Sequence, residues 1–183
     1  MPNEDDVLKI TIKWATAKAL QIGQAYSQSG GWEGWAQVEL AMAFKAAFPT
    51  TTVQREVHSF DVSAYKADFM LTHPGYQPLI IEIKCESSGQ DRPGPSAFWR
   101  AYTMDLQKAT NYLINPIYLP ATVWTIGFTC KDIVTNEGQR RLKHDEFGPY
   151  NVGNWPCAQT ATGEWVNVWA SVDYITKVGK SKL

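Results

Sequence analysis

The chain has 183 residues, of which 44% are hydrophobic and 19% are charged. This composition is typical of a folded globular protein and excludes a collagen-like or wholly disordered chain, so we expect a single domain over residues 1–183. Seventeen Lys and Arg oppose eighteen Asp and Glu, which gives a formal net charge of −1. Without an overall basic excess, contact with nucleic acid must depend on a local patch of cations or on a bound metal.

Targeting signals are sparse in the sequence. No apolar run reaches the roughly 20 residues that span a bilayer, and the first six residues, MPNEDD, are acidic, so we expect neither membrane contact nor a secretory signal peptide. The three cysteines lie far apart and outside any metal-binding spacing, which predicts a reducing, cytoplasmic compartment. The ending Ser181-Lys182-Leu183 matches a peroxisomal address that only a eukaryotic host reads, and a chance ending explains it more simply.

The first 50 residues predict two helices. Residues 5–28 carry apolar side chains at helical spacing behind two acidic residues that suit the positive end of a helix dipole. The Ala-rich segment 32–48 predicts a second helix that ends before Pro49. Its apolar side chains recur at helical spacing at Trp35, Val38, Met42 and Ala43.

The next segments predict strands. Residues 51–60, 64–73 and 78–86 are rich in β-branched and alternating apolar residues. The connection HPGYQP between the last two segments is typical of a tight turn, so these two strands should form a hairpin.

The second half of the chain continues with alternating elements. We expect in turn a loop at 87–96, a helix at 97–114, a strand at 122–130, a polar, Gly-rich irregular segment at 131–163 and a strand or strand pair at 164–175. The loop-like stretch EFGPYNVGNWP belongs to the irregular segment. This order predicts an α/β (α+β mixed) fold in which helices flank a mixed central sheet.

Two charged residues interrupt the apolar strand expected at 78–86. Glu82 and Lys84 are two positions apart and therefore point to one face of the strand, whereas Ile83 and Cys85 point to the other. Ionised groups in such a strand destabilise it by several kcal/mol unless they are paired or hold a metal. The placement of Glu82 and Lys84 therefore predicts a chemical role, while Cys85 is expected to be a small core side chain.

Asp68 provides a partner for Glu82. It lies in the preceding strand, which the hairpin should place beside the strand of Glu82, so the two carboxylates can converge. A hard divalent cation such as Mg²⁺ relieves the repulsion between two such groups. Without metal this repulsion should destabilise the fold, and we expect Asp68→Asn to melt higher than wild type in EDTA. Lys84 could orient or deprotonate a water, or offset charge on a phosphate.

These residues resemble the signature of the PD-(D/E)XK nuclease superfamily, which has the restriction-endonuclease-like fold. Asp68 corresponds to the motif Asp, and Glu82-Ile83-Lys84 corresponds to the (D/E)XK element. The core order of the family, namely helix, three strands, helix and strand, matches residues 32–130. The chain departs from the motif at Ala67, where the family pattern has Pro.

The resemblance implies hydrolysis of phosphodiester bonds in DNA or RNA with Mg²⁺ or, alternatively, Mn²⁺. It implies that Asp68 and Glu82 bind the metal and that Lys84 positions water or stabilises charge. It also implies that Glu39, in the helix before the sheet, is an outer metal ligand, although Glu33 lies close by in the same segment.

Some members of the superfamily carry a catalytic Gln in the helix after the (D/E)XK strand, followed four residues later by Tyr. Gln107 matches that Gln, but Asn111 stands at the position of the Tyr. The neighbouring Lys108 could contact phosphate in its place. Other cations that could form a phosphate-facing rim are Arg92, Arg100, Lys131, Arg140, Arg141 and Lys143, although the segment RRLKHDE also suits a solvated face of mixed charge.

Several alternatives stay open at this point. A Glu-x-Lys pattern also occurs on solvated edge strands, where it forms weak ion pairs. Asp61 could replace Asp68 as a ligand, but it lies in an apparent turn. A catalytically silent binding or inhibitor module on the same fold is a further alternative, which the intact Asp68, Glu82 and Lys84 disfavour. Because nuclease toxins and effectors use this fold, an inhibitor or immunity protein is a candidate partner besides nucleic acid.

Overall fold

The computed structural model describes residues 4–28, 31–61, 65–88, 97–111, 114–130 and 152–176. Within these ranges six strands form one mixed sheet with four α-helices packed against it, which confirms the predicted mixed α/β class. The elements are α1 (Glu4–Ala17), α2 (Ala19–Tyr26), α3 (Glu33–Ala47), β1 (Thr52–Val57), β2 (Ala67–Thr72), β3 (Leu79–Cys85), α4 (Ala97–Asn111), the 3-10 helix η2 (Pro116–Tyr118), β4 (Ala121–Thr129), β5 (Gly153–Gln159) and β6 (Trp165–Ile175). No helix in the described ranges is long and apolar enough to cross a membrane.

The strand order in the sheet is β1-β2-β3-β4-β6-β5. Strands β1, β2 and β3 form an antiparallel meander, and the hairpin predicted between β2 and β3 is confirmed. Strand β3 runs parallel to β4, and α4 makes the connection between them. A parallel pair needs such a crossover, and its helix then covers one face of the sheet. Strands β3 and β4 are therefore central and nearly continuously buried.

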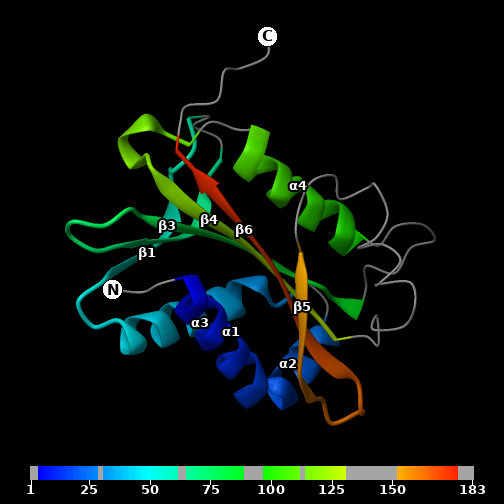
Figure 1. Cartoon of the computed structure of the whole chain (residues 1–183). Coiled ribbons are helices and arrows are strands. Elements are labelled where there is room, and N and C mark those ends of the chain that lie inside the picture. The colour runs from blue at the N-terminus through cyan, green and yellow to red at the C-terminus, as the bar shows by residue number, and fades with distance from the viewer. Residues whose placement is uncertain are drawn as a thin grey trace.

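Helices cover both faces of the sheet (Figure 1). Helices α1, α2 and α3 lie on one face, and α4 lies on the other. The odd-numbered side chains of β3, including the predicted core residue Cys85, pack in the core beneath α1 to α3. On the α4 face the core includes Phe98, Trp99, Tyr102 and Trp169. Trp99 is only 3% exposed, so its ring belongs to the core.

The N-terminal helix expected at 5–28 is two helices. The first ends at Ala17, and Lys18 has φ −104° and ψ 10°, outside helical values, before α2 begins at Ala19. Hydrogen bonds from Lys18 N to Trp14 O and from Ile22 N to Lys18 O keep the two helices continuous in hydrogen bonding. The amphipathic pattern continues across this bend, which is why periodicity does not reveal it.

The C-terminal half differs from expectation at one strand. Residues 153–159 form the edge strand β5, although the Gly and Pro content of this stretch predicts a loop. Pro156 lies next to a register shift between β5 and β6, and proline is tolerated at the edge of a sheet and at bulges. The strand predicted at 164–175 is confirmed as the single strand β6.

Helix α4 is shorter than the predicted helix at 97–114. It ends at Asn111, and Ile114 forms an antiparallel bridge with Phe60. Both side chains are buried in a small apolar cluster that also contains Met70 and Ile80. The apolar Ile114 therefore belongs to this cluster, whereas the sequence pattern placed it on the helix.

Candidate functional site

Glu82 lies in the middle of the sheet. Strand β3 pairs with β4 from Leu79 to Cys85 and with β2 as far as Ile81, and Glu82 is only 3% exposed. The alternative of a Glu-x-Lys pattern on a solvated edge strand is therefore wrong. A buried carboxylate in a central strand needs cations, hydrogen bonds or protonation to be tolerated.

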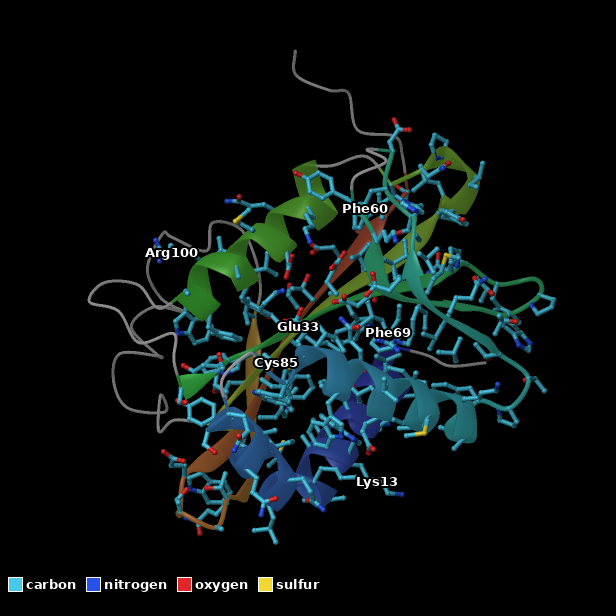
Figure 2. The ribbon with its side chains drawn as sticks, turned by 180° about the vertical axis from the view of Figure 1, so that it is seen from behind. Lys13, Glu33, Phe60, Phe69, Cys85 and Arg100 are labelled. Atoms are coloured by element: carbon cyan, nitrogen blue, oxygen red, sulfur yellow. The ribbon has the colours of Figure 1, made fainter. Side chains whose placement is uncertain are left out.

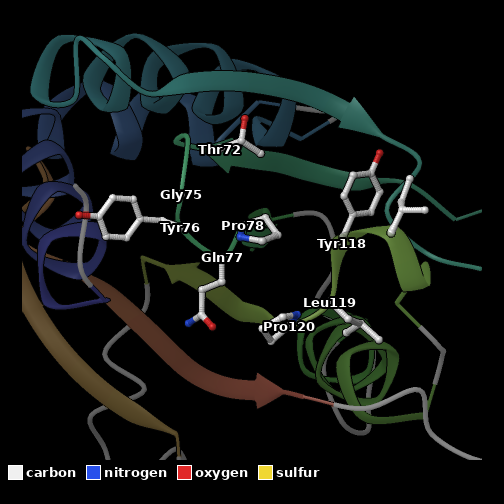
Figure 3. A pocket seen from close by; sticks show the side chains of 9 residues that line it. Thr72, Gly75, Tyr76, Gln77, Pro78, Tyr118, Leu119 and Pro120 are labelled. Carbon is white, nitrogen blue, oxygen red and sulfur yellow. The ribbon is translucent and has the colours of Figure 1, made fainter.

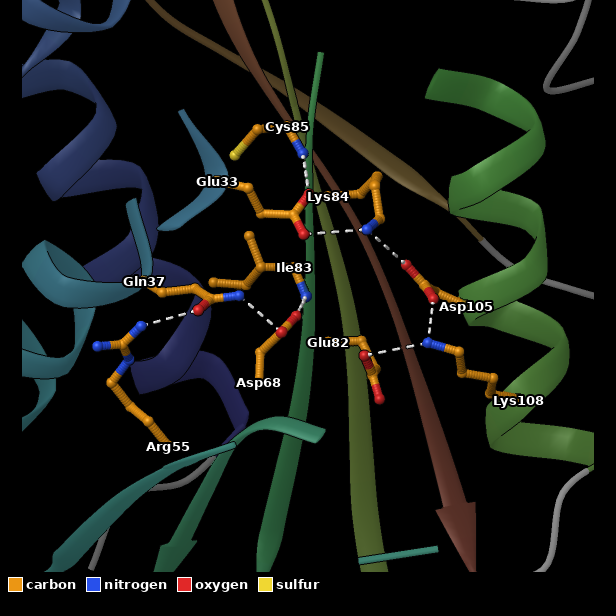
Figure 4. Close-up of polar contacts among 10 residues, drawn as sticks. All are labelled: Glu33, Gln37, Arg55, Asp68, Glu82, Ile83, Lys84, Cys85, Asp105 and Lys108. Atoms are coloured by element: carbon orange, nitrogen blue, oxygen red, sulfur yellow. Dashed lines mark hydrogen bonds and ion pairs between the residues drawn. The ribbon is translucent and has the colours of Figure 1, made fainter. Parts of the chain in front are cut away.

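Two carboxylates bind the outer edge of β3 beyond the end of its pairing with β2. The register of β2 and β3 ends at Phe69 opposite Ile81. Beyond Ile81, backbone N–H groups of β3 donate to side chains instead of to β2. Ile83 N donates to Asp68 Oδ2 at 2.6 Å, and Cys85 N donates to Glu33 Oε2 at 3.2 Å (Figure 4). Asp68 and Glu33 thus satisfy backbone donors that a neighbouring strand would otherwise satisfy.

Helix α3 contacts the second carboxylate oxygen of Asp68. Gln37 Nε2 donates to Asp68 Oδ1 at 2.7 Å, and Arg55 Nη2 of β1 donates to Gln37 Oε1 at 2.9 Å. Gln37 is 5% exposed, so its contact with Asp68 is shielded from solvent, although Arg55 itself is exposed. The Asp68 carboxylate is consequently fixed by α3, β1 and β3 together.

Helix α4 provides the remaining charges. Asp105 lies between two lysines, with Oδ2 3.7 Å from Lys84 Nζ and Oδ1 2.6 Å from Lys108 Nζ. Lys84 Nζ also contacts Glu33 Oε1 at 3.1 Å, and Lys108 Nζ lies 3.6 Å from Glu82 Oε2. The ammonium groups of both lysines therefore bridge carboxylates on different elements.

We call Glu33, Asp68, Glu82, Lys84, Asp105 and Lys108 the carboxylate–lysine cluster. It contains four carboxylates and two ammonium groups, a formal charge of −2 when all six are ionised. The side chains of Glu82 and Asp105 are 3% and 5% exposed, whereas those of Lys84, Lys108 and Glu33 are 25%, 20% and 32% exposed. The cluster is thus shielded from solvent at Glu82 and Asp105 and partly open to solvent at Lys84, Lys108 and Glu33.

The environment disfavours ionisation of the two carboxylates that the sequence singles out. Burial raises the pKa of Asp68 to about 7, an effect that outweighs the hydrogen bond from Ile83 N, which lowers it. Burial likewise raises the pKa of Glu82 well above its ordinary value, and the charge of Asp68 is the next largest cause. Two adjacent carboxyl groups that are hard to ionise together form a site that a cation would stabilise.

The two lysines are held in their charged form. Burial alone would lower the pKa of Lys84, but Asp105 and Glu33 together outweigh it and the pKa is raised. For Lys108 burial is likewise outweighed, chiefly by Glu82 and Asp105, and the pKa is raised. Both side chains therefore carry ammonium groups at neutral pH, which suits contact with an anion.

Three buried oxygen atoms in the site have no hydrogen-bond partner within the described part of the chain. They are Glu82 Oε1, Oγ1 of Thr125, which lies opposite Glu82 in β4, and Asp105 Oδ2, which has only the ion pair with Lys84 Nζ at 3.7 Å. Buried polar groups are nearly always satisfied in native proteins, so such atoms call for an explanation such as a water or an ion. Glu82 Oε1 is consequently the best-placed free ligand atom of the cluster.

The structure brings together three of the five predicted catalytic residues, Asp68, Glu82 and Lys84. It does not bring Glu39 to them. Glu39 faces the junction of α1 and α2, where its Oε2 atom lies 2.8 Å from Lys18 Nζ. Gln107 is exposed on α4, whereas Asp105 and Lys108 of the same helix face the sheet. Glu33 thus occupies the position expected for Glu39, and Lys108 occupies that expected for Gln107.

The rotation of α3 explains the error at Glu39. The buried residues of this helix are Ala36, Gln37, Leu40 and Phe44, and Val38 and Met42 are exposed. Glu33 precedes Gln37 by four positions and therefore shares the face that meets the sheet. The large apolar side chains of Val38 and Met42 suggested a different face, so sequence reasoning missed Glu33. The spacing of Glu33, Gln37, Leu40 and Phe44 is the signal that would have found it.

Asp105 was also missed by sequence reasoning. It follows the buried Phe98 and Tyr102 by seven and three positions, which is the spacing of one helix face. Most of the other rim cations, Arg92, Lys131, Arg140, Arg141 and Lys143, lie outside the described residues, as does the C-terminal tripeptide. Arg100 is exposed and projects away from the cluster, whereas Glu33 lies between the two helix layers (Figure 2).

The cluster fits a magnesium ion with few protein ligands. No group of three or more His, Cys, Asp or Glu side chains in the described residues is arranged to hold a metal. Mg²⁺, however, is commonly held by one or two carboxylates and several waters. Glu82 Oε1 is free to bind, and each oxygen of Asp68 accepts one hydrogen bond and retains a lone pair.

A separate hollow lies beside the turn that precedes β3, and none of its lining residues belongs to the cluster (Figure 3). Its volume is about 460 Å³, and its lining includes Gln77, Pro78, Tyr118 and Leu119. The tyrosines are its only titratable lining groups, and it contains no carboxylate or ammonium group. The carboxylate–lysine cluster is therefore the better candidate for chemistry.

No family model, curated protein or solved structure matches the chain.

The different positions of Glu33 and Glu39 predict different effects on stability. Glu33→Ala removes the acceptor for the Cys85 N–H group and a partner of Lys84, so we expect it to lower the free energy of unfolding by about 1–3 kcal/mol. Glu39→Ala removes one contact with Lys18 and should change stability little. Urea unfolding of both variants measures the difference, and equal losses would show that Glu33 does not support β3.

Proposed function

We propose that the protein is a metal-dependent nuclease with a restriction-endonuclease-like core. The observation that carries the proposal is the convergence of Asp68 and Glu82 with the ammonium group of Lys84 in a partly closed cluster of net negative charge. Carboxylates alone would repel a phosphodiester, and lysines alone would not hold a divalent cation. A cluster with both kinds of group can hold both.

The order of elements supports the proposed core. Helix α3, strands β1 to β3, helix α4 and strand β4 follow one another as the superfamily pattern requires. Asp68 lies in β2 and the Glu82-Ile83-Lys84 element lies in β3, so both parts of the motif fall on the expected strands. The helical acid of the proposed site is Glu33, in place of Glu39.

The proposed reaction adds water across a phosphodiester bond. The oxygen of water attacks phosphorus, the bond from phosphorus to the leaving oxygen breaks, and the proton lost by the water is balanced by one taken up at the leaving oxygen. Mg²⁺ bound by Asp68 and Glu82 would supply positive charge that stabilises the transition state at the phosphate. Lys84, held by Glu33 and Asp105, would donate a hydrogen bond to the attacking water or to a phosphate oxygen.

A silent binding module on the same fold is the second candidate. One observation favours it: both oxygens of Asp68 already accept hydrogen bonds, and Lys108 already lies near Glu82. In that case the cluster would be a structural ion network that stabilises the junction of α3, β3 and α4. Contacts with an inhibitor or immunity protein, and a role as toxin or effector, stay predictions under either candidate.

Cleavage assays separate the two candidates. Purified protein is incubated with supercoiled plasmid, single-stranded DNA and structured RNA in Mg²⁺, Mn²⁺ or EDTA. We expect at least one substrate to be cleaved in Mg²⁺ or Mn²⁺ and none to be cleaved in EDTA. Binding of these substrates without cleavage in any metal would support the silent module.

A further inference from the structure

We infer that Lys108 is a second lysine that contacts the scissile phosphate and that Asp105 is the residue that positions it. The inference rests on the proposed nuclease function and adds α4 to the residues that bind substrate. Neither residue belongs to the Asp and Glu-x-Lys pattern, because both come from the helix that crosses over from β3 to β4.

The ammonium group of Lys108 lies close to two carboxylates of the cluster. Its Nζ atom lies 2.6 Å from Asp105 Oδ1 and 3.6 Å from Glu82 Oε2, so it stands directly beside a proposed metal ligand. An ammonium group has three N–H donors, and the short contact with Asp105 uses one of them. The side chain is 20% exposed, which leaves Lys108 accessible from the open side of the cluster.

Further contacts restrict where Lys108 can point. The ring of Tyr65 lies near its Nζ atom, with 5.9 Å between the nitrogen and the ring centroid. Such a contact is weakly attractive for a cation. With Tyr65, Asp105 and Glu82 around it, the ammonium group is directed toward the cluster, whereas a surface lysine of a helix normally extends into water.

Asp105 links the two lysines of the cluster. One of its oxygens faces Lys84 and the other faces Lys108, and its side chain is 5% exposed. A buried carboxylate between two ammonium groups fixes their separation. Lys84 and Lys108 are thereby arranged as a pair on one side of Glu82. Asp105 itself is a positioning residue, because it acts through these lysines.

The chemistry of a phosphodiester matches this pair. The phosphate has two non-bridging oxygens, and negative charge on them increases or shifts as water attacks. One ammonium group can bind a non-bridging oxygen while the other donates a hydrogen bond to the attacking water. Because Lys84 lies on the same strand as Glu82, with Glu33 as partner, we assign the water to Lys84 and the non-bridging oxygen to Lys108.

The test compares Lys108→Gln, Lys108→Arg and Asp105→Asn with wild type, and Lys45→Gln is the matched control. Gln can still donate a hydrogen bond to Asp105 but carries no charge, so Lys108→Gln preserves the packing of α4. Lys45 is an exposed lysine near the end of α3. We measure kcat and KM in Mg²⁺, and the affinity for a fluorescein-labelled oligonucleotide in Ca²⁺ at several salt concentrations.

We expect Lys108→Gln to lower kcat by about 10²-fold or more, as for loss of one donor to developing charge. The slope of log affinity against log salt should decrease in magnitude by about 0.7–0.9, which corresponds to one phosphate contact. Lys108→Arg should retain the slope and part of the rate, since the charge is kept. Asp105→Asn should lower kcat and change the slope less, because Lys108 stays charged. Lys45→Gln should behave as wild type.

The outcomes for Lys108 and for the proposed function are distinguishable. Wild-type kcat and an unchanged salt slope in Lys108→Gln, with an inactive Lys84→Met, would overturn the inference and leave the nuclease function intact. Failure of wild type to cleave any substrate would overturn both. If Lys108→Gln does not fold, a wild-type rate in the folded Asp105→Asn variant would overturn the positioning role, and a wild-type salt slope in Lys108→Met would overturn the contact with phosphate.

Discussion

Glu82→Gln and Lys84→Met should each lower kcat by at least about 10²-fold without unfolding the protein. Glu82 provides a free buried oxygen of the site, and Gln removes the negative charge and replaces one oxygen by an NH₂ group that cannot bind Mg²⁺. Lys84 provides an ammonium group fixed by Glu33 and Asp105, and Met retains its apolar stem while it removes the charge. Groups that act mainly in the transition state affect kcat more than KM.

The matched control for this prediction is Glu39→Gln. Glu39 lies in the same helix as Glu33 but contacts Lys18, so its substitution should leave kcat unchanged. Steady-state kinetics of the three variants, with circular dichroism to verify folding, provide the measurement. Wild-type turnover in well-folded Glu82→Gln and Lys84→Met would show that the cluster has no part in the reaction.

The carboxylates should also make stability depend on pH and on metal. The pKa of Asp68 is about 7 in the folded protein against an ordinary value of 3.8, and the pKa of Glu82 is raised as well. Between the unfolded and folded pKa values the folded state binds more protons than the unfolded state, so the free energy of unfolding falls as pH rises. The stability that protonation provides is present below the unfolded pKa and is lost as pH rises through about 7.

We therefore expect Glu82→Gln to melt higher than wild type in EDTA near pH 8, by several degrees, and to differ much less near pH 5. One kcal/mol corresponds to about 2–4 °C in a domain of this size. Mg²⁺ should raise the melting temperature of wild type near pH 8 and hardly change that of Glu82→Gln, because a ligand stabilises only the state that binds it. Differential scanning fluorimetry over this pH range measures both effects.

The difference between wild type and variant cancels the titration of carboxylates that do not interact with Glu82, which makes it more informative than either curve alone. A difference that is independent of pH, together with no response of wild type to Mg²⁺, would contradict the shared site. The sequence suggested Asp68→Asn for this test, but the structure shows why Glu82→Gln is better. Both Asp68 oxygens accept hydrogen bonds, so an Asn amide would place an NH₂ group against Ile83 N or Gln37 Nε2.

The part of the site on β2 and β3 could be predicted because it depends on local pattern. An apolar strand with Glu82 and Lys84 two positions apart, next to a tight turn, fixes the face of each side chain and the proximity of Asp68. The register of Phe69 with Ile81 confirms this hairpin. Local sequence patterns likewise predicted correctly that α3 is a helix and that β4 and β6 are strands.

The contributions of the two helices could not be predicted in the same way. Which face of a helix meets the sheet depends on tertiary packing, and the exposed Val38 and Met42 pointed to the wrong face of α3. The bridge of Asp105 to both Lys84 and Lys108 joins α4 to β3. Only the crossover geometry brings these residues together. Strand β5 was missed because Pro in a strand is tolerated mainly at edges and bulges, and neither feature is visible in sequence.

The most direct test of the proposed function is a Mg²⁺ titration of the cleavage rate, from EDTA to saturation, with wild type and Glu82→Gln on the best substrate from the cleavage assays. The proposed site predicts saturable activation of wild type from a rate near zero in EDTA, and little or no activation of Glu82→Gln at any Mg²⁺ concentration. Cleavage that persists in EDTA, or equal activation of the two proteins, would contradict it.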